Sequence, residues 1–138
     1  MSVEAVLDSN ILLYAASKDP RDAAKAEVAL RLLATVNFEV PLQVAQEFFH
    51  NARVKARLAI EPEHCDKMIE ALLQRPLLVT DTNLFKAARQ LCRRYKITYW
   101  DAAVLEACKR LGAAVLYSED LSDGQDYGGV RVVNPFRG

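Results

Sequence analysis

Short apolar runs alternate along the chain with longer segments in which apolar residues recur every three or four positions. Buried strands are predicted at residues 3–7, 38–40, 77–79, 113–117 and 130–133. Helices that bury one face are predicted at residues 11–16, 19–36, 44–59, 62–73, 82–95 and 98–112. Because parallel strands need crossover connections, this alternation predicts an α/β fold, a three-layer α/β/α sandwich with a mainly parallel sheet.

Residues suited to helix ends support these boundaries. Asp81 or Thr82 can cap the helix that follows, and Gly112 suits the C-terminal end of another. Thr98 and Asp101 have the spacing of a capping box, in which a hydroxyl and an acid satisfy the first free backbone donors. Asp101 is therefore expected in the first turn of its helix.

Length and composition favour one globular domain covering residues 1–138. The chain has 51% apolar residues, enough to bury a core. It lacks both a run of ~18 apolar residues and the layout of a signal peptide, so we expect a cytoplasmic protein without a membrane segment. The three cysteines, Cys65, Cys92 and Cys108, are widely spaced and are expected to be reduced, packed thiols.

The overall charge does not indicate a nucleic-acid-binding protein. Eighteen basic residues balance eighteen acidic residues, so the formal net charge is zero. Local positive charge is nevertheless available around Arg53, and separately around Lys86 and Arg89. These side chains are candidates for contacts with a phosphate backbone, although ordinary solvated helix faces explain them about as well.

Acidic residues follow the predicted strands. Asp8 ends the first strand and Asp120 lies shortly after the 113–117 strand, while Asp101 begins a helix that should face the same edge of the sheet. Glu47, on the third predicted helix, is a further candidate. Ligands of open parallel sheets bind beyond the carboxyl ends of the strands. We therefore expect a site where these acids meet.

A divalent cation is the simplest reason for several carboxylates to share a cleft. Neighbouring carboxylates repel one another, and a site made of oxygen ligands suits Mg²⁺ or Mn²⁺. Such an ion can activate water and stabilise charge on a phosphoryl oxygen, which is how acidic clusters hydrolyse phosphodiesters.

Each acid also has a structural explanation. Asp8 can simply cap the following helix, and Asp101 can be only a capping-box residue. Asp120 and Asp123 lie in a loop rich in Ser, Asp and Gly, where turn formation commonly explains Asp. His50 forms a Glu-x-x-His pair with Glu47, but a di-iron bundle needs a second pair, so a surface or packed histidine is expected.

Four motifs in order resemble those of PIN-domain nucleases. They are V-L-D-S-N at Asp8, V-A-Q-E-F-F-H-N at Glu47, Y-W-D-A-A-V-L-E-A at Asp101 and Y-S-E-D-L-S-D-G-Q at Asp120. Each is weak alone, but four in order on an α/β pattern are specific. The closing N-P-F is similar to one PIN subgroup, and the chain's size resembles that of VapC-type toxins.

This resemblance implies a site and partners. It implies that Asp8, Glu47 and Asp101 hold Mg²⁺ or Mn²⁺, with Asp120 as the fourth acid and Asp123 as its substitute or helper. Asn10 and Ser118 are implied to support the geometry. VapC-type toxins cleave RNA, commonly form homodimers and are held inactive by an antitoxin protein, so the same partners are expected here.

Two other functions are compatible with the residues. A Mg²⁺-dependent phosphatase would use Asp8 as its nucleophile, but Asn10 stands where such chemistry needs a second Asp. A non-catalytic module that binds RNA or protein would keep the acids for structure alone. Metal-dependent stabilisation distinguishes such a module from the two enzymes.

Overall fold

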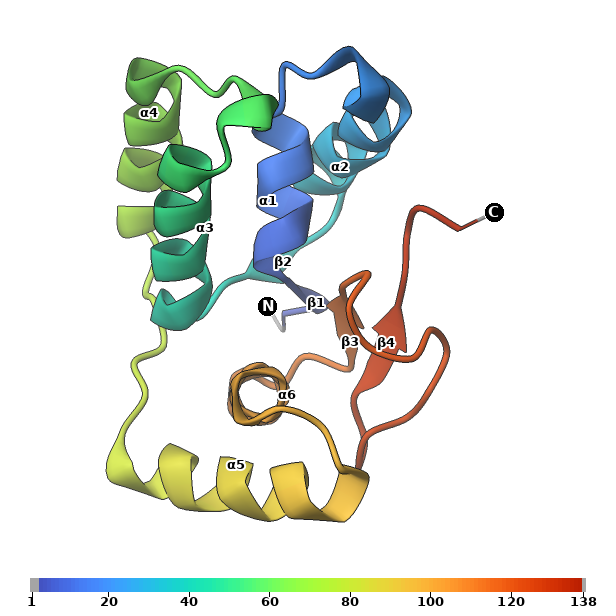
Figure 1. Ribbon diagram of the computed structural model, residues 1–138. Helices are drawn as coiled ribbons and strands as arrows, with labels where there is room; N and C mark the ends of the chain where they lie inside the picture. Colours follow the sequence, from blue (N-terminus) through green and yellow to red (C-terminus); the bar gives the residue numbers. More distant parts are fainter. Residues whose placement is uncertain (1–2, 138) are drawn as a thin grey trace.

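A parallel sheet forms the centre of the computed structural model, which describes residues 3–137 (Figure 1). Its strands within that range are β1 Ala5–Leu7, β2 Phe38–Glu39, β3 Val115–Tyr117 and β4 Arg131–Val133. Their order is β2-β1-β3-β4, and every pairing is parallel. The two central strands, β1 and β3, therefore deliver their carboxyl ends to the same edge.

Helices cover both faces of this sheet. They are α1 Ser9–Ala16, α2 Ala23–Thr35, α3 Leu42–Val54, α4 Pro62–Leu73, α5 Thr82–Tyr95 and α6 Tyr99–Leu111, with 3-10 turns η1 Pro20–Asp22 and η2 Ala56–Leu58. In Figure 1, α1 to α4 lie above the sheet, and α5 and α6 lie below it. The predicted three-layer α/β/α arrangement with a mainly parallel sheet is confirmed.

The central strands form the core because they are buried on both faces. Val6, Leu7 and Leu116 are fully buried, as expected for parallel strands between two helical layers. From the helical layers, Phe48 of α3 and Leu105 of α6 are equally inaccessible. This packing fixes the end of β1 against the end of β3.

One predicted strand is wrong. Residues 77–79 form only an isolated parallel bridge between Leu78 and Pro41, and no strand. Leu77 and Leu78 pack half-buried against the core, whereas Val79 is 60% exposed. Pro41 has no backbone N–H to donate to a ladder, and α3 begins immediately after it, so the pairing does not extend.

Two predicted helices are interrupted. The segment expected to be helical at 19–36 begins as the 3-10 turn η1 before α2, and the segment expected at 44–59 is α3 followed by η2. In η2, Arg57 reaches Asp19 and Asp22 at 2.8 and 2.9 Å. This tertiary ion pair accompanies both interruptions and joins the two turns.

Other predicted details agree with the structure. Asp81 and Thr98 cap α5 and α6 through their side chains, and Gly112 ends α6 with a φ of 76°. The cysteines are free thiols, as expected. Among the described residues, no helix is long and apolar enough to span a membrane.

Candidate active site

Asp8 lies directly after the central strand β1 and caps helix α1. Its Oδ1 accepts a 2.8 Å hydrogen bond from the Ser9 backbone N–H, and its Oδ2 accepts a 2.7 Å bond from the Ser118 hydroxyl. The residue is only 5% exposed. The Asp8 pKa is raised to about 6, chiefly by burial; the two hydrogen bonds oppose this rise, and the nearby charges of Asp120 and Glu47 add to it.

Ser118 and Asn10 connect Asp8 to Asp120. The buried Ser118 oxygen accepts hydrogen bonds from the Asp120 backbone N–H at 3.1 Å and from Asn10 Nδ2 at 3.4 Å. Asn10 Nδ2 also donates to Asp120 Oδ2 at 3.2 Å. One connected set of hydrogen bonds thus orders the segment after β3 against the start of α1.

Glu47 joins this set from helix α3. Its Oε2 accepts a 3.2 Å hydrogen bond from the Ser9 hydroxyl, and its Oε1 accepts a 2.7 Å bond from Gln43 Nε2. Helices α1 and α3 pack side by side. Glu47 is therefore held beside the residue that follows Asp8, a contact that links positions far apart in the sequence.

Asp101 approaches from the other helical layer. Its backbone N–H donates a 3.1 Å hydrogen bond to Thr98 Oγ1, which confirms the predicted cap. Partial burial is the main cause that raises the Asp101 pKa; the Thr98 side chain lowers it and the Asp120 charge raises it. Asp120 thus interacts electrostatically with both Asp8 and Asp101.

Glu119 anchors the segment that carries Ser118 and Asp120. It accepts a 2.5 Å hydrogen bond from the Tyr14 hydroxyl and a 3.0 Å charged hydrogen bond from Lys25 Nζ. Sequence reasoning did not identify this anchor, because its three residues come from distant parts of the chain.

An open pocket of about 220 Å³ adjoins these groups. Its lining includes Ser9, Asn10, Glu47 and Asp120, and also the basic residues Lys55 and Arg57. Arg57 is already paired with Asp19 and Asp22, whereas Lys55 forms no ion pair with the described residues. Lys55 is thus the basic side chain available to an anion in this pocket.

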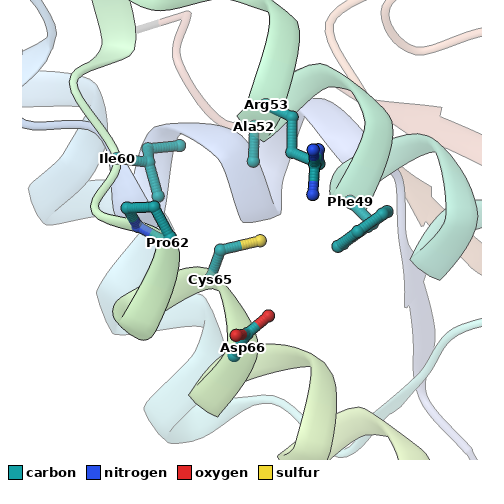
Figure 2. A pocket seen from close by; sticks show the side chains of 7 residues that line it. All are labelled: Phe49, Ala52, Arg53, Ile60, Pro62, Cys65 and Asp66. Carbon is teal, nitrogen blue, oxygen red and sulfur yellow. The ribbon is translucent and has the colours of Figure 1, made fainter.

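The three basic residues singled out from the sequence lie elsewhere. Figure 2 shows Arg53 in a separate pocket of about 270 Å³ between α3 and α4, where its guanidinium lies 5.3 Å from the centre of the Phe49 ring. Lys86 and Arg89 belong to α5, in the layer on the other side of the sheet, and Arg89 lies 5.8 Å from the Phe85 ring. The described lining of the acidic pocket includes none of the three.

Asp123 and His50 have other surroundings. Asp123 Oδ1 accepts a 2.8 Å hydrogen bond from the Asn134 backbone N–H, and its Oδ2 lies 3.9 Å from Arg137 Nη1. Asp123 therefore holds the C-terminal segment. His50 is exposed on α3, as expected.

The carboxylate and amide oxygens of this site are the ligands that a hard cation prefers, but the acidic side chains do not converge on one point. Across residues 3–137, no group of three His, Cys, Asp or Glu side chains is arranged to hold a metal ion. The buried Asn10 Oδ1 has no hydrogen-bond partner among the described residues, and Asp8 is buried beside like charges. A cation would offset that repulsion and interact with the amide oxygen, so the residues present fit Mg²⁺ or Mn²⁺.

Comparison with known proteins reveals both a family match and similar folds. The model of the family described as "PIN domain" matches residues 5–122. A toxin–antitoxin complex from Klebsiella pneumoniae superposes with a TM-score of 0.68 at 18% identity, covering 96% of this chain and 98% of that one. No curated protein matches the sequence significantly.

Two further solved structures are similar. VapC20 of Mycobacterium tuberculosis, a toxin that cleaves the sarcin–ricin loop, has a TM-score of 0.62 at 17% identity, over 85% of this chain and 90% of that one. FitAcB of Neisseria gonorrhoeae has a TM-score of 0.61 at 14% identity, over 96% and 98%. At these identities the likeness concerns the fold.

Proposed function

Because this chain belongs to the PIN-domain family, we propose that it is an endoribonuclease that depends on Mg²⁺ or Mn²⁺ and hydrolyses RNA phosphodiester bonds. The observation that carries the proposal is the surroundings of Asp8. This carboxylate at the end of β1 is linked through Ser118 to Asp120; burial is the main cause that raises its pKa, and the charges of Asp120 and Glu47 add to the rise. The carboxylates of such a cluster repel one another, and a bound cation offsets this repulsion.

In this proposal, Asp8, Glu47, Asp101 and Asp120 hold the cation. A bound ion would lower the pKa of water and stabilise the negative charge that develops on the reacting phosphate. Ser118 and the Ser9 backbone N–H orient Asp8, while Asn10 orients Asp120. Hydrogen bonds of this kind hold a metal-binding side chain in a fixed orientation.

The RNA strand is proposed to enter along the open pocket. Lys55, which is free of ion pairs with described residues, binds a phosphate next to the acids. Arg53, Lys86 and Arg89 stay predicted RNA contacts, and their positions place such contacts farther from the site of cleavage. Asp123 is not among the proposed ligands, because it bonds the segment containing Asn134.

We also propose that the protein is the toxin of a toxin–antitoxin pair. The similar structures include a toxin–antitoxin complex and a toxin that cleaves the sarcin–ricin loop. The proposed partners are an antitoxin protein that blocks the cleft and a second copy of the chain in a homodimer, and the proposed location is the cytoplasm. Growth arrest on bacterial expression of the wild type, absent for Asp101→Asn, supports this role; equal growth of the two strains contradicts it.

Cleavage of purified RNAs tests the enzymatic activity directly. A mixed panel of structured and single-stranded RNAs is incubated with the protein and Mn²⁺ or Mg²⁺, alongside EDTA and Asp101→Asn controls purified identically. The expected result is cleavage that is lost in both controls. Cleavage that survives both controls is a contaminant, and folded wild-type protein that neither binds Mn²⁺ nor cleaves any RNA overturns the proposal.

The surroundings of Asp8 disfavour the phosphatase alternative. Such a phosphatase needs a second Asp as general acid, and the position two residues after Asp8 is occupied by Asn10, whose amide is not a general acid. Asn10, which would have to be the general acid, is bonded to Ser118 and Asp120. Hydrolysis of a small phosphomonoester by protein that leaves RNA intact would reverse this preference.

A further inference from the structure

An exposed tryptophan stands beside the proposed catalytic acids. Trp100 is the only tryptophan of the chain, lies in the first turn of α6 directly before Asp101, and is 64% exposed. Large aromatic side chains normally bury most of their surface. The exposure of this one is therefore a feature that the packing of the fold does not explain.

The position of Trp100 is fixed by its neighbours. Its ring packs edge to face against Tyr99 at 5.0 Å, and Tyr99 packs in the same way against Phe85 at 5.6 Å. The Trp100 carbonyl accepts a 3.2 Å hydrogen bond from Gln43 Nε2, and the same amide donates to Glu47 Oε1. The backbone of Trp100 is thus connected through Gln43 to an acid of the proposed site, while its exposed ring contacts Tyr99.

Trp100 also lines an open hollow of about 380 Å³ together with Gln43, Gln46 and Glu47. Glu47 borders the acidic pocket as well, so the two spaces adjoin. A flat aromatic ring suits stacking of a nucleobase, and side-chain amides can form hydrogen bonds with a base edge. The hollow therefore combines the groups that bind an unstacked base.

We infer that Trp100 is a stacking platform for one nucleobase of the RNA, which places the adjoining phosphodiester at the acidic site. The inference rests on the proposed ribonuclease function. It commits to RNA because the hollow combines a flat exposed ring with side-chain amides and shares Glu47 with the acidic pocket, so a base stacked there lies next to the proposed site of cleavage. A stacked base leaves the open side of the hollow in water.

Fluorescence of the single tryptophan measures this contact without cleavage. Metal-free protein in EDTA is titrated with a single-stranded RNA of roughly 12 nucleotides, with the same RNA annealed to its complement, and with versions carrying one abasic position. Saturable quenching by the single strand is expected, with little quenching by the duplex and weaker quenching when the stacked position is abasic. Equal quenching by duplex and single strand overturns the inference.

Cleavage kinetics separate stacking from folding. Trp100→Leu should lower kcat/KM for the single strand about tenfold, mainly through KM, whereas Trp100→Phe keeps part of the activity. Phe49→Leu is the matched control, because Phe49 is also an exposed aromatic residue but lies in the α3–α4 pocket (Figure 2). All three variants should retain the wild-type circular dichroism spectrum.

The possible results distinguish the inference from the function on which it rests. Cleavage by wild type that is unchanged in Trp100→Leu overturns the stacking platform and leaves the ribonuclease intact. Saturable quenching by protein that cleaves no RNA supports the platform and refutes the nuclease. A blue shift of Trp100 emission with protein concentration, without RNA, assigns the surface to a protein interface and overturns the inference.

Discussion

The Ser118 hydroxyl donates a 2.7 Å hydrogen bond to Asp8 Oδ2 across the carboxyl ends of β1 and β3. These strands are in parallel register, with Leu7 beside Tyr117, so the two residues are the first beyond the paired strands. The same Ser118 oxygen accepts the Asp120 backbone N–H. One buried hydroxyl group thus orients one proposed metal ligand and the chain that carries another.

Ser118→Ala should weaken metal binding and cleavage more than it weakens the fold. Loss of the donor to Asp8 and of the acceptor for Asp120 is expected to reduce metal affinity and kcat/KM by roughly 10- to 100-fold, with a stability loss of about 1 kcal/mol. Isothermal titration with Mn²⁺ and urea unfolding measure the two effects. Ser122→Ala is the control, because that exposed hydroxyl has no hydrogen bond with the described residues; equal effects of both substitutions would refute the role of Ser118.

Burial of Asp8 should make the metal-free protein sensitive to pH. The folded-state pKa of about 6 lies above the ordinary value of 3.8, so the contribution of Asp8 is fully favourable below pH 4 and is lost as pH rises through 6. The difference corresponds to roughly 3 kcal/mol. Part of this is already lost at pH 4.5, so relative to Asp8→Asn the wild type in EDTA should lose about 2 kcal/mol of unfolding free energy between pH 4.5 and pH 7.5.

Urea unfolding of both proteins at the two pH values measures this change. Mn²⁺ at pH 7.5 should restore stability to the wild type and leave Asp8→Asn nearly unaffected, since a bound cation offsets the buried charge. Asp66→Asn, on the exposed face of α4, controls for the general effect of removing a carboxylate. A difference between wild type and Asp8→Asn that stays constant with pH would show that Asp8 ionises normally.

Local sequence signals predicted those parts of the fold that depend on neighbouring residues. The helices at 62–73 and 82–95 begin and end where predicted, because Pro62 and Asp81 mark their starts through backbone geometry and capping. The predicted strand at 77–79 is wrong because an apolar run alone cannot reveal that Pro41, its partner, lacks a donor and precedes a helix.

In the candidate site, too, the features set by neighbouring residues could be predicted, and those set by the packing of helices could not. The position of Asp8 after a buried strand followed from the apolar pattern, and its capping role was among the predicted alternatives. The contact of Ser9 with Glu47 and the anchoring of Glu119 by Lys25 depend on how helices pack, which one sequence does not specify. For the same reason, Lys55 could not be ranked above Arg53 before the orientation of α3 was known.

Lys55→Ala should weaken RNA binding by removing one phosphate contact. We expect a several-fold increase in KM with little change in stability, and a decrease of about 0.7 in the slope of log affinity against log salt concentration. Arg53→Ala removes an equal charge from the α3–α4 pocket and is the comparison: its proposed RNA contact lies farther from the acids, so its effect on KM should be smaller. A larger effect of Arg53→Ala would mean that the RNA follows the α3–α4 pocket instead.

Thr98 should affect catalysis because its hydroxyl fixes the turn that carries Asp101. Thr98 Oγ1 accepts the Asp101 backbone N–H at 3.1 Å, and its side chain also lowers the Asp101 pKa. Thr98→Ala is expected to cost about 1 kcal/mol of stability and to raise the Asp101 pKa. The pH at which cleavage reaches half its maximum should therefore move upward, because a larger share of Asp101 is protonated at any given pH.

Thr98→Ser separates this effect from general destabilisation, because Ser keeps the capping hydroxyl. It should retain most of the stability and the wild-type pH profile of kcat/KM. Gly112→Ala is a second control: it strains the other end of α6, where φ is 76°, and lowers stability without touching Asp101. If Gly112→Ala shifted the pH profile as far as Thr98→Ala, the shift would reflect a loosened α6, and the Thr98 hydroxyl would have no specific effect on Asp101.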